Sequence, residues 1–192
     1  MQTQPSLATD RLILRPLTQD DAPALAAHCA PIEIAMQTRT IPHPYPPEAA
    51  PAAIERFTRS WTDGTGAVFA ATLRDTGRFI GVCGLHVFPE QHHAEIGYTI
   101  SMDHWGRGYA TEAVLALLRY GFEGREPPLN KLWAGWYIDN PASGRVLEKV
   151  GMKQEGVQRQ HAYRFGRYRD VVLVGMLREE WIARRGETGG TD

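Results

Sequence analysis

Two glycines, Gly106 and Gly108, stand where a strand-like segment gives way to a helix-like one. The strand pattern ends near Ser101, and apolar residues at helical spacing begin at Ala110. The first turn of a helix presents backbone N–H groups that have no partner within the helix, and glycines let a ligand approach them closely. The segment WGRGYATEA therefore predicts a phosphate-binding site.

The residues around the glycines discriminate between kinds of phosphate site. A nucleoside-triphosphate loop requires Lys and then Ser or Thr after its last glycine, whereas Tyr109 follows Gly108. A dinucleotide loop requires a third small residue, where this chain has Thr111, and it follows the first strand of its domain. This motif comes too late in the chain for that arrangement. A tight turn into a helix, without a ligand, stays open on the glycines alone.

The other reactive side chains do not form a set of metal ligands. Cys29 lies in an alanine-rich helical stretch and Cys83 in an apolar strand, so both are expected to be buried, reduced thiols. His86, His92 and His93 flank a predicted turn, and the adjacent pair would point to opposite faces of a strand. We expect no metal site.

The elements that must position these residues alternate along the chain. The residue patterns predict strands over 12–17, 67–73, 79–88, 94–101 and 131–138, and two further β-rich segments around 163–168. They predict helices over 18–30, over about 53–61, over 105–124, and after Asn140, with a proline-rich loop over 31–51. Strands and helices interleave around one sheet without a long linker, which indicates one α/β or α+β domain.

The predicted strand AEIGYTIS has two unlike faces. Ile96, Tyr98 and Ile100 share the apolar face, whereas the small or polar face carries the residues Glu95, Gly97 and Thr99. The aromatic residues Trp133, Trp136, Tyr137 and Trp181 are expected in the core.

Composition excludes several function classes. The chain has 192 residues with 22% charged and 43% apolar side chains, which is typical of a globular protein rather than a disordered or fibrous one. A net charge of −1 provides no general attraction for nucleic acid or an anionic membrane. The first ten residues lack the basic and apolar regions of an export signal, and the longest apolar run is far too short to cross a bilayer.

Five segments, in family order, resemble the GCN5-related N-acetyltransferases (GNAT), most closely their RimJ/RimL-like branch. They are TDRLILRPLTQDDAPAL, AEIGYTI, WGRGYATEA, DNPASGRVLEKVGM and RYRDVVLVGMLREEW. Trp105 departs from the Gln or Arg that opens the family's loop, but Gly108 and Ala110 match. The resemblance implies a single GNAT domain over 1–184 with a C-terminal tail over 185–192. Its mixed central sheet would have about seven strands, splayed between the fourth and fifth, and about four flanking helices.

The resemblance also implies acetyl-CoA as the co-substrate. Its pyrophosphate would lie on the amides of the loop, which comprises Gly106, Arg107, Gly108, Tyr109, Ala110 and Thr111. Its pantetheine arm would pair like an added strand with Tyr98, Thr99 and Ile100. Asn140 and Ser143 match positions that meet the pantetheine and the sulfur, although capping of the following helix is an alternative role for them.

The implied reaction needs a base for the amine and a proton donor for the thiolate. Glu95 is the expected base, because it lies on the polar face of its strand and matches an acidic position of many relatives. A solvent-facing strand carboxylate is the alternative. Many relatives have a Tyr acid where this chain has Leu147, so Ser143 is the expected acid here.

A basic segment lies near the C-terminus. Lys153, Arg159, Arg164, Arg167 and Arg169 stand against Glu155 alone between residues 153 and 169. A solvated hairpin is one explanation. A surface for RNA, for an acidic protein or for the 3′-phosphate of CoA is the other.

The preferred acceptor is expected to be the N-terminal amine of a ribosomal or other protein. A small-molecule amine such as a polyamine, an antibiotic or an amino-acid-like compound is an alternative, as is a catalytically weak acetyl-CoA sensor. The loop over 31–51, with Tyr45, is expected to form one wall of the acceptor site. We expect a cytoplasmic monomer or homodimer, with no membrane partner and no specific nucleic acid.

Overall fold

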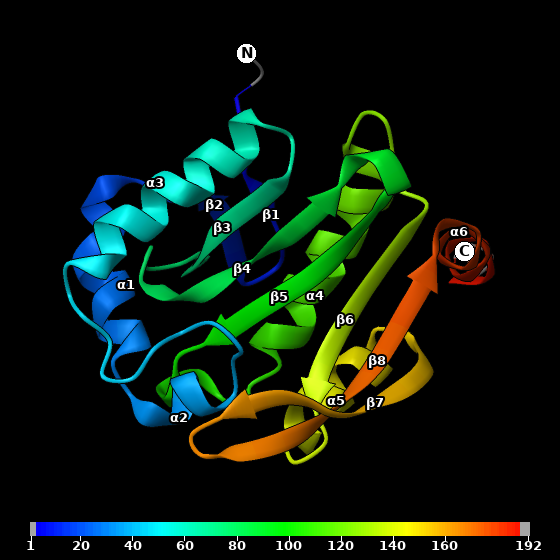
Figure 1. Cartoon of the computed structure of the whole chain (residues 1–192). Helices are drawn as coiled ribbons and strands as arrows, with labels where there is room; N and C mark the ends of the chain where they lie inside the picture. The colour runs from blue at the N-terminus through cyan, green and yellow to red at the C-terminus, as the bar shows by residue number, and fades with distance from the viewer. Residues whose placement is uncertain (1–2, 189–192) are drawn as a thin grey trace.

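A mixed sheet of eight strands runs through the part of the chain that the computed structural model describes, residues 3–188 (Figure 1). The sheet order is β1-β2-β3-β4-β5-β6-β8-β7. The strands are β1 (Leu7–Ala8), β2 (Leu12–Pro16), β3 (Gly66–Leu73), β4 (Phe79–Phe88), β5 (His93–Ile100), β6 (Lys131–Tyr137), β7 (Lys153–Arg164) and β8 (Arg167–Leu177). Every neighbouring pair is antiparallel except β5 and β6, which are parallel.

Helices cover both faces of this sheet (Figure 1). They are α1 (Ala22–Cys29), α2 (Ile32–Met36), α3 (Ala49–Thr62), α4 (Tyr109–Arg119), α5 (Pro141–Lys149) and α6 (Arg178–Thr188). The main core packs α4 and α5 against the sheet through residues such as Val114, Leu117 and Leu147. A smaller core packs α1 and α3 against the other face through Leu25 and Ile54.

The parallel pair β5 and β6 separates soon after it begins. Register pairs run from His93 with Lys131 to Glu95 with Trp133, and the pairing stops there. Each strand remains paired on its other side, β5 with β4 and β6 with β8. The sheet therefore opens into a wedge between Ile96–Ile100 and Ala134–Tyr137, which confirms the expected splay.

The predicted strands and the four predicted helices are confirmed, and the structure adds three elements. Strand β1 has two residues, too few for an alternating pattern. Helix α2 has five residues and follows Pro31 inside the segment predicted as a loop. Helix α6 follows β8 and continues past Arg184 to Thr188.

Helix α4 is shorter than the predicted 105–124. It begins at Tyr109, because Gly106 and Gly108 have φ values of +73° and +82°, outside the right-handed helical region. Its last predicted turn, Tyr120–Gly124, is π-helical.

Candidate active site

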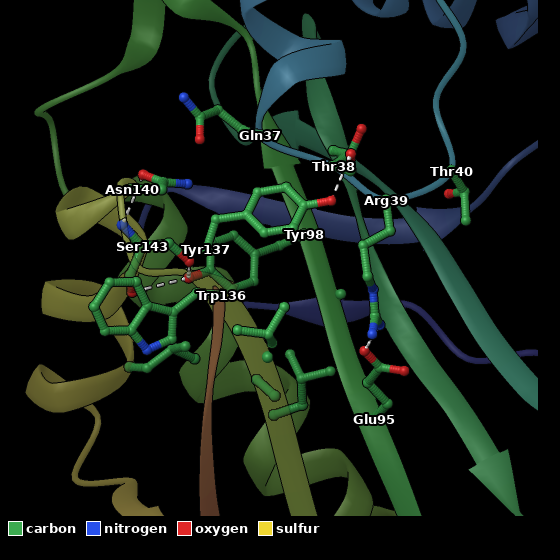
Figure 2. Close-up of a pocket in the computed structure, with 16 residues that line it drawn as sticks. Gln37, Thr38, Arg39, Thr40, Glu95, Tyr98, Trp136, Tyr137, Asn140 and Ser143 are labelled. Atoms are coloured by element: carbon green, nitrogen blue, oxygen red, sulfur yellow. Dashed lines mark hydrogen bonds and ion pairs between the residues drawn. The ribbon is translucent and has the colours of Figure 1, made fainter. Parts of the chain in front are cut away.

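A cavity of about 190 Å³ lies in the wedge between β5 and β6 (Figure 2). Strands β5, β6 and β8, the start of α5 and the residues after α2 supply its walls. The lining residues are Gln37, Thr38, Arg39, Thr40, Glu95, Ile96, Gly97, Tyr98, Ala134, Gly135, Trp136, Tyr137, Asn140, Ser143, Leu147 and Val171.

The free edge of β5 faces this wedge. The Ser101 amide donates to the Ile80 carbonyl on β4, at 2.7 Å. Hydrogen-bonding directions alternate along a strand, so the main-chain groups of Tyr98 and Ile100 point away from β4 and toward the wedge. The Trp105 indole Nε1 donates to the Ile100 carbonyl at 2.5 Å. The residue that departs from the family's loop thus fastens the loop to the strand.

The glycine loop lies next to that edge. The first bond within α4 runs from the Glu112 amide to the Gly108 carbonyl at 3.1 Å. Helical geometry therefore leaves the preceding amides of the helix without a carbonyl partner inside it. A Cβ built on Gly106 would meet no atom within 4 Å, so this backbone faces open space. Arg11 supports the loop by donating to the Arg107 carbonyl at 2.9 Å while pairing with Glu112.

Helix α5 brings two side chains to the wedge. Asn140 caps the helix, because its Oδ1 accepts from the Ser143 amide at 3.3 Å. The Ser143 Oγ lies 2.7 Å from the Tyr98 hydroxyl, which also donates to the Ser143 carbonyl at 3.2 Å. Burial raises the pKa of Tyr98 to about 12. Two protonated hydroxyls therefore bridge the wedge.

The opposite side of the cavity holds an ion pair. Glu95 on β5 pairs with Arg39, which reaches it from the segment after α2 (Figure 2). The Glu95 side chain is 18% exposed and that of Arg39 is 39% exposed. His86 on β4 stands opposite Glu95 in the strand register, which places both side chains on one face of the sheet.

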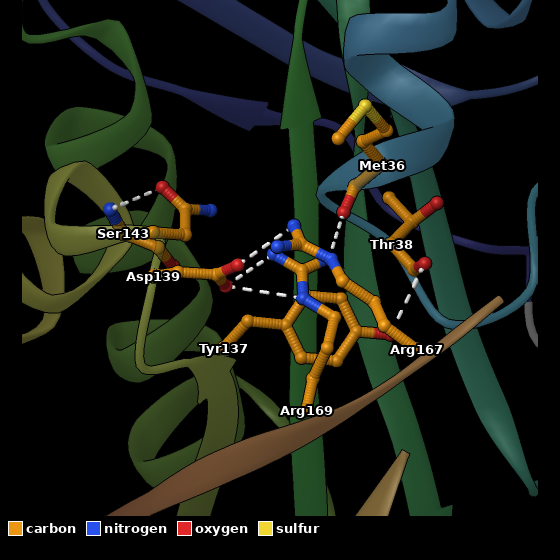
Figure 3. A network of polar contacts seen from close by, with 8 residues as sticks. Met36, Thr38, Tyr137, Asp139, Ser143, Arg167 and Arg169 are labelled. Atoms are coloured by element: carbon orange, nitrogen blue, oxygen red, sulfur yellow. Dashed lines mark hydrogen bonds and ion pairs between the residues drawn. The ribbon is translucent and has the colours of Figure 1, made fainter. Parts of the chain in front are cut away.

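We name residues 35–41 the strap. Four hydrogen bonds from side chains of β6, β7 and β8 end on strap carbonyl oxygens, and Figure 3 shows those to Met36 and Thr38. Arg164 donates to Ala35 at 3.3 Å and to Ile41 at 2.5 Å, and Arg169 donates to Met36. The hydroxyl of Tyr137 donates to Thr38 at 3.3 Å.

Asp139 keeps the central arginine of this network in place. Arg169 is 5% exposed, pairs with Asp139 and stacks on the Tyr137 ring, 3.7 Å from its centroid. Arg167 adds a second ion pair to Asp139 at 2.9 Å. The two cations hold the pKa of the Asp139 carboxyl below its usual value, although burial opposes them.

These contacts revise the interpretation of the basic segment. Arg164, Arg167 and Arg169 bind groups of this chain, and Lys153 pairs with Glu180 at 2.5 Å. The positive charge seen in the sequence is thus largely matched within the molecule. Arg164 and Arg169 bind the strap, whereas Lys153, Arg159 and Arg167 are exposed to solvent on the β7–β8 hairpin.

The structure brings the two predicted catalytic residues to opposite sides of one cavity. Residues 37–40 of the strap, within the segment predicted as a loop over 31–51, line this cavity. Tyr45, also expected there, packs instead beside the smaller core of α1 and α3. Sequence reasoning missed the contributions of Arg39 and Trp136. Trp136 was expected in the core but lines the cavity. The sequence feature that could have pointed to Arg39 is an arginine inside the proline-rich segment 31–51.

The remaining candidates behave as buried groups. Cys29 and Cys83 are buried free thiols, and burial raises their pKa values to about 11 and about 12. Within residues 3–188, no group of three or more His, Cys, Asp or Glu side chains lies close enough together to hold a metal ion. Each helix in that range is too short or too polar to cross a membrane.

The wedge, the glycine loop beside it and the acid–hydroxyl arrangement define an acyl-transfer enzyme of the N-acetyltransferase class. Residues 11–153 match the family model described as the acetyltransferase (GNAT) domain, and the chain belongs to this family. It therefore has the single-domain GNAT fold that its sequence predicts.

Comparison with individual proteins agrees with this assignment. The chain is 34% identical over 175 residues to the uncharacterised N-acetyltransferase YoaA of Bacillus subtilis, covering 91% of this chain and 97% of that protein. It is 28% identical over 187 residues to the ribosomal protein uS5 alanine N-acetyltransferase of Escherichia coli, covering 93% and 94%. A structure of RimL, a ribosomal L7/L12 α-N-protein acetyltransferase bound to coenzyme A, shares the fold. Its TM-score is 0.83 at 19% identity, with coverage of 92% of this chain and 99% of RimL.

Proposed function

We propose that this N-acetyltransferase acetylates the N-terminal amine of a protein or peptide, with Glu95 as base and Ser143 as acid. The observation that carries the choice of acceptor is the charge of the cavity. Among the described residues that line it, the charged ones are Glu95 and Arg39. A polyamine site would need several carboxylates to match several ammonium groups. A single carboxylate suits an acceptor with one amine.

The groups beside the wedge fit acetyl-CoA as the donor. The amides of 106–111 at the start of α4 suit its pyrophosphate, because helix N-termini favour anions. The main chain of Tyr98 and the Ile100 amide, on the free edge of β5, suit the amides of its pantetheine arm. When bound, acetyl-CoA supplies an activated acetyl thioester with a thiol leaving group.

The chain's own residues then handle two protons. Glu95 accepts one from the acceptor nitrogen as the nitrogen–carbon bond forms. Ser143 donates one to the departing sulfur as the carbon–sulfur bond breaks, and it regains a proton from solvent. The Tyr98 hydroxyl, which keeps its own proton, holds Ser143 toward the wedge.

The chemistry of amines favours the same acceptor. A peptide α-amine has a pKa of about 7.7 to 8, so about a tenth is neutral at pH 7. A lysine or polyamine amine near 10.4 costs about 4.6 kcal/mol to deprotonate at pH 7. One carboxylate suits the easier case. The name of the uS5 alanine N-acetyltransferase, a relative along most of the chain, points in the same direction.

Comparing acceptors tests the proposal. We expect a peptide with a free α-amine to have a higher kcat/KM than spermidine or an aminoglycoside. The assay measures the free thiol that is released from acetyl-CoA. The same peptide with a blocked N-terminus and a free lysine is the matched control, and we expect it to react poorly. A small amine that is ahead by more than about tenfold would refute the acceptor. Tight acetyl-CoA binding without thiol release for any amine would instead indicate a sensor.

A further inference from the structure

Arg39 occupies the position that an acceptor must enter. Its guanidinium pairs with Glu95, the proposed base, inside the cavity. The acceptor nitrogen needs the same carboxylate in order to lose its proton. Arg39 must therefore move away from Glu95, at least in part, whenever an acceptor binds productively.

The strap limits where Arg39 can go. The strap is anchored on both sides of Arg39. The carbonyls of Met36 and Thr38 accept hydrogen bonds before it in the sequence, and that of Ile41 accepts one after it. The backbone at Arg39 is thus fixed over the cavity, and its side chain must find a new partner within reach. A displaced guanidinium in a partly buried site loses a charge-assisted hydrogen bond unless an anion replaces Glu95.

The cavity offers no second anion for this exchange. Its other described lining residues are apolar or carry neutral polar groups. Asp139, in the adjacent network, is already engaged by Arg167 and Arg169. An acceptor that carries an anion therefore restores the lost bond, whereas a neutral acceptor leaves the partly exposed Arg39 guanidinium to water.

On this basis we propose that Arg39 is a specificity-determining residue that selects acceptors with a carboxylate close to the reacting amine. Binding exchanges the Arg39–Glu95 pair for one between Arg39 and the acceptor carboxylate, which leaves Glu95 free to take the proton. This inference rests on the proposed function. Two sources supply this chemistry: an acidic side chain near a peptide N-terminus, or the α-carboxylate of a free amino acid.

Acceptor pairs that differ in one charge test the exchange. Peptides with Asp or Asn at the second position form one pair, and a free amino acid with its amide forms the other. We expect the wild-type enzyme to favour the acidic member of at least one pair by about tenfold or more in kcat/KM, mainly through KM. The pair that responds identifies the source of the carboxylate.

Variants then assign the preference to one side chain. Arg39→Gln should reduce the preference to within about twofold, mainly by raising KM for the acidic acceptor, because a neutral amide cannot pair with its carboxylate. Arg39→Lys should retain part of the preference. Arg56→Gln, at an exposed arginine on α3, should behave like the wild type. Calorimetry should show unchanged acetyl-CoA affinity for all three.

Different results overturn different claims. Equal use of acidic and neutral acceptors by the wild-type enzyme would refute the role of Arg39 alone. So would an equal loss with both members of a pair in Arg39→Gln, because that result indicates a structural role. If the wild-type enzyme acetylates none of these α-amines, the proposed function fails and this inference fails with it.

Discussion

At the scale of single residues, the cavity separates the two groups proposed to handle protons by placing them on different elements, Glu95 on β5 and Ser143 on α5. Glu95 belongs to the polar face of β5, and Tyr98, which holds Ser143, belongs to the apolar face. A strand alternates its side chains, so β5 presents Glu95 on one face while Tyr98, on the other face, contacts the Ser143 hydroxyl. The pKa of Tyr98, raised to about 12 by burial, keeps its hydroxyl protonated near neutral pH.

Glu95→Gln should preserve acetyl-CoA binding and lower kcat by about 10² to 10⁴, the usual contribution of a general acid or base. The amide still accepts a hydrogen bond from Arg39 but no longer takes a proton. Steady-state kinetics with Glu90→Gln, a nearby exposed carboxylate, provides the control. Wild-type turnover in Glu95→Gln at pH 7 would show that the carboxylate is a surface group.

At the scale of elements, β5 and the loop after it form one unit. The strand leads into Trp105, whose indole bonds back to Ile100, and then into the two glycines at the start of α4. The loop is thereby fixed to the edge that borders the wedge. Close approach to its amides depends on Gly106 having no side chain in the open space before it.

Gly106→Val should weaken acetyl-CoA binding by at least about 2 kcal/mol, because a branched side chain displaces charge-assisted hydrogen bonds worth about 1.5 to 3 kcal/mol each. Isothermal calorimetry measures this loss. Gly77→Val is a matched control, because Gly77 has a φ of +69° against +73° for Gly106, and a Cβ at either position meets no atom within 4 Å. Both variants place a branched side chain at a positive φ. If the two variants bind acetyl-CoA with equal affinity, the assignment of this loop to the acetyl-CoA site is wrong.

Local pattern was enough to predict β5, its two faces and the start of α4, because alternation and glycine placement are short-range signals. The contacts that complete the site are long-range. Arg169 reaches the carbonyl of Met36 across 133 positions in the sequence, and Tyr98 reaches Ser143 across 45. Residue periodicity contains no information about such pairs. The sequence therefore indicated the predicted catalytic residues but not the partner of either one.

At the scale of the whole molecule, one sheet separates two cores, and His28 links the smaller core to β5. Its Nδ1 lies 2.8 Å from the Ser101 hydroxyl and its Nε2 lies 2.8 Å from the Thr99 hydroxyl. Burial lowers the pKa of His28 to about 4, so the ring is neutral in the folded protein at neutral pH. Helix α1 is thus joined to β5 by a group that resists protonation.

The free energy of unfolding should therefore decrease as the pH falls from about 6.5 toward 4. In that window the unfolded chain protonates His28 and the folded chain does not, which costs up to about 3 kcal/mol by linkage. Above pH 6.5 this contribution is constant. Urea denaturation at several pH values measures the slope for the wild type and for His28→Gln, whose amide does not titrate. Burial also lowers the pKa of His104, but both proteins contain this residue. Its contribution to the pH dependence therefore cancels when the two slopes are compared. Equal slopes would contradict the assignment.

The strap has a consequence for how this enzyme could change over evolution. Its four anchoring bonds end on main-chain oxygens, which every amino acid provides. Replacing the side chains of Gln37 or Thr40 therefore removes none of these four bonds, and replacing Arg39 removes only its ion pair with Glu95. Mutation can exchange the chemical groups that this segment offers to an acceptor while the segment stays in place. Main-chain oxygens hold the segment and its side chains line the cavity, so substitutions here can change the lining of the cavity at little cost to folding.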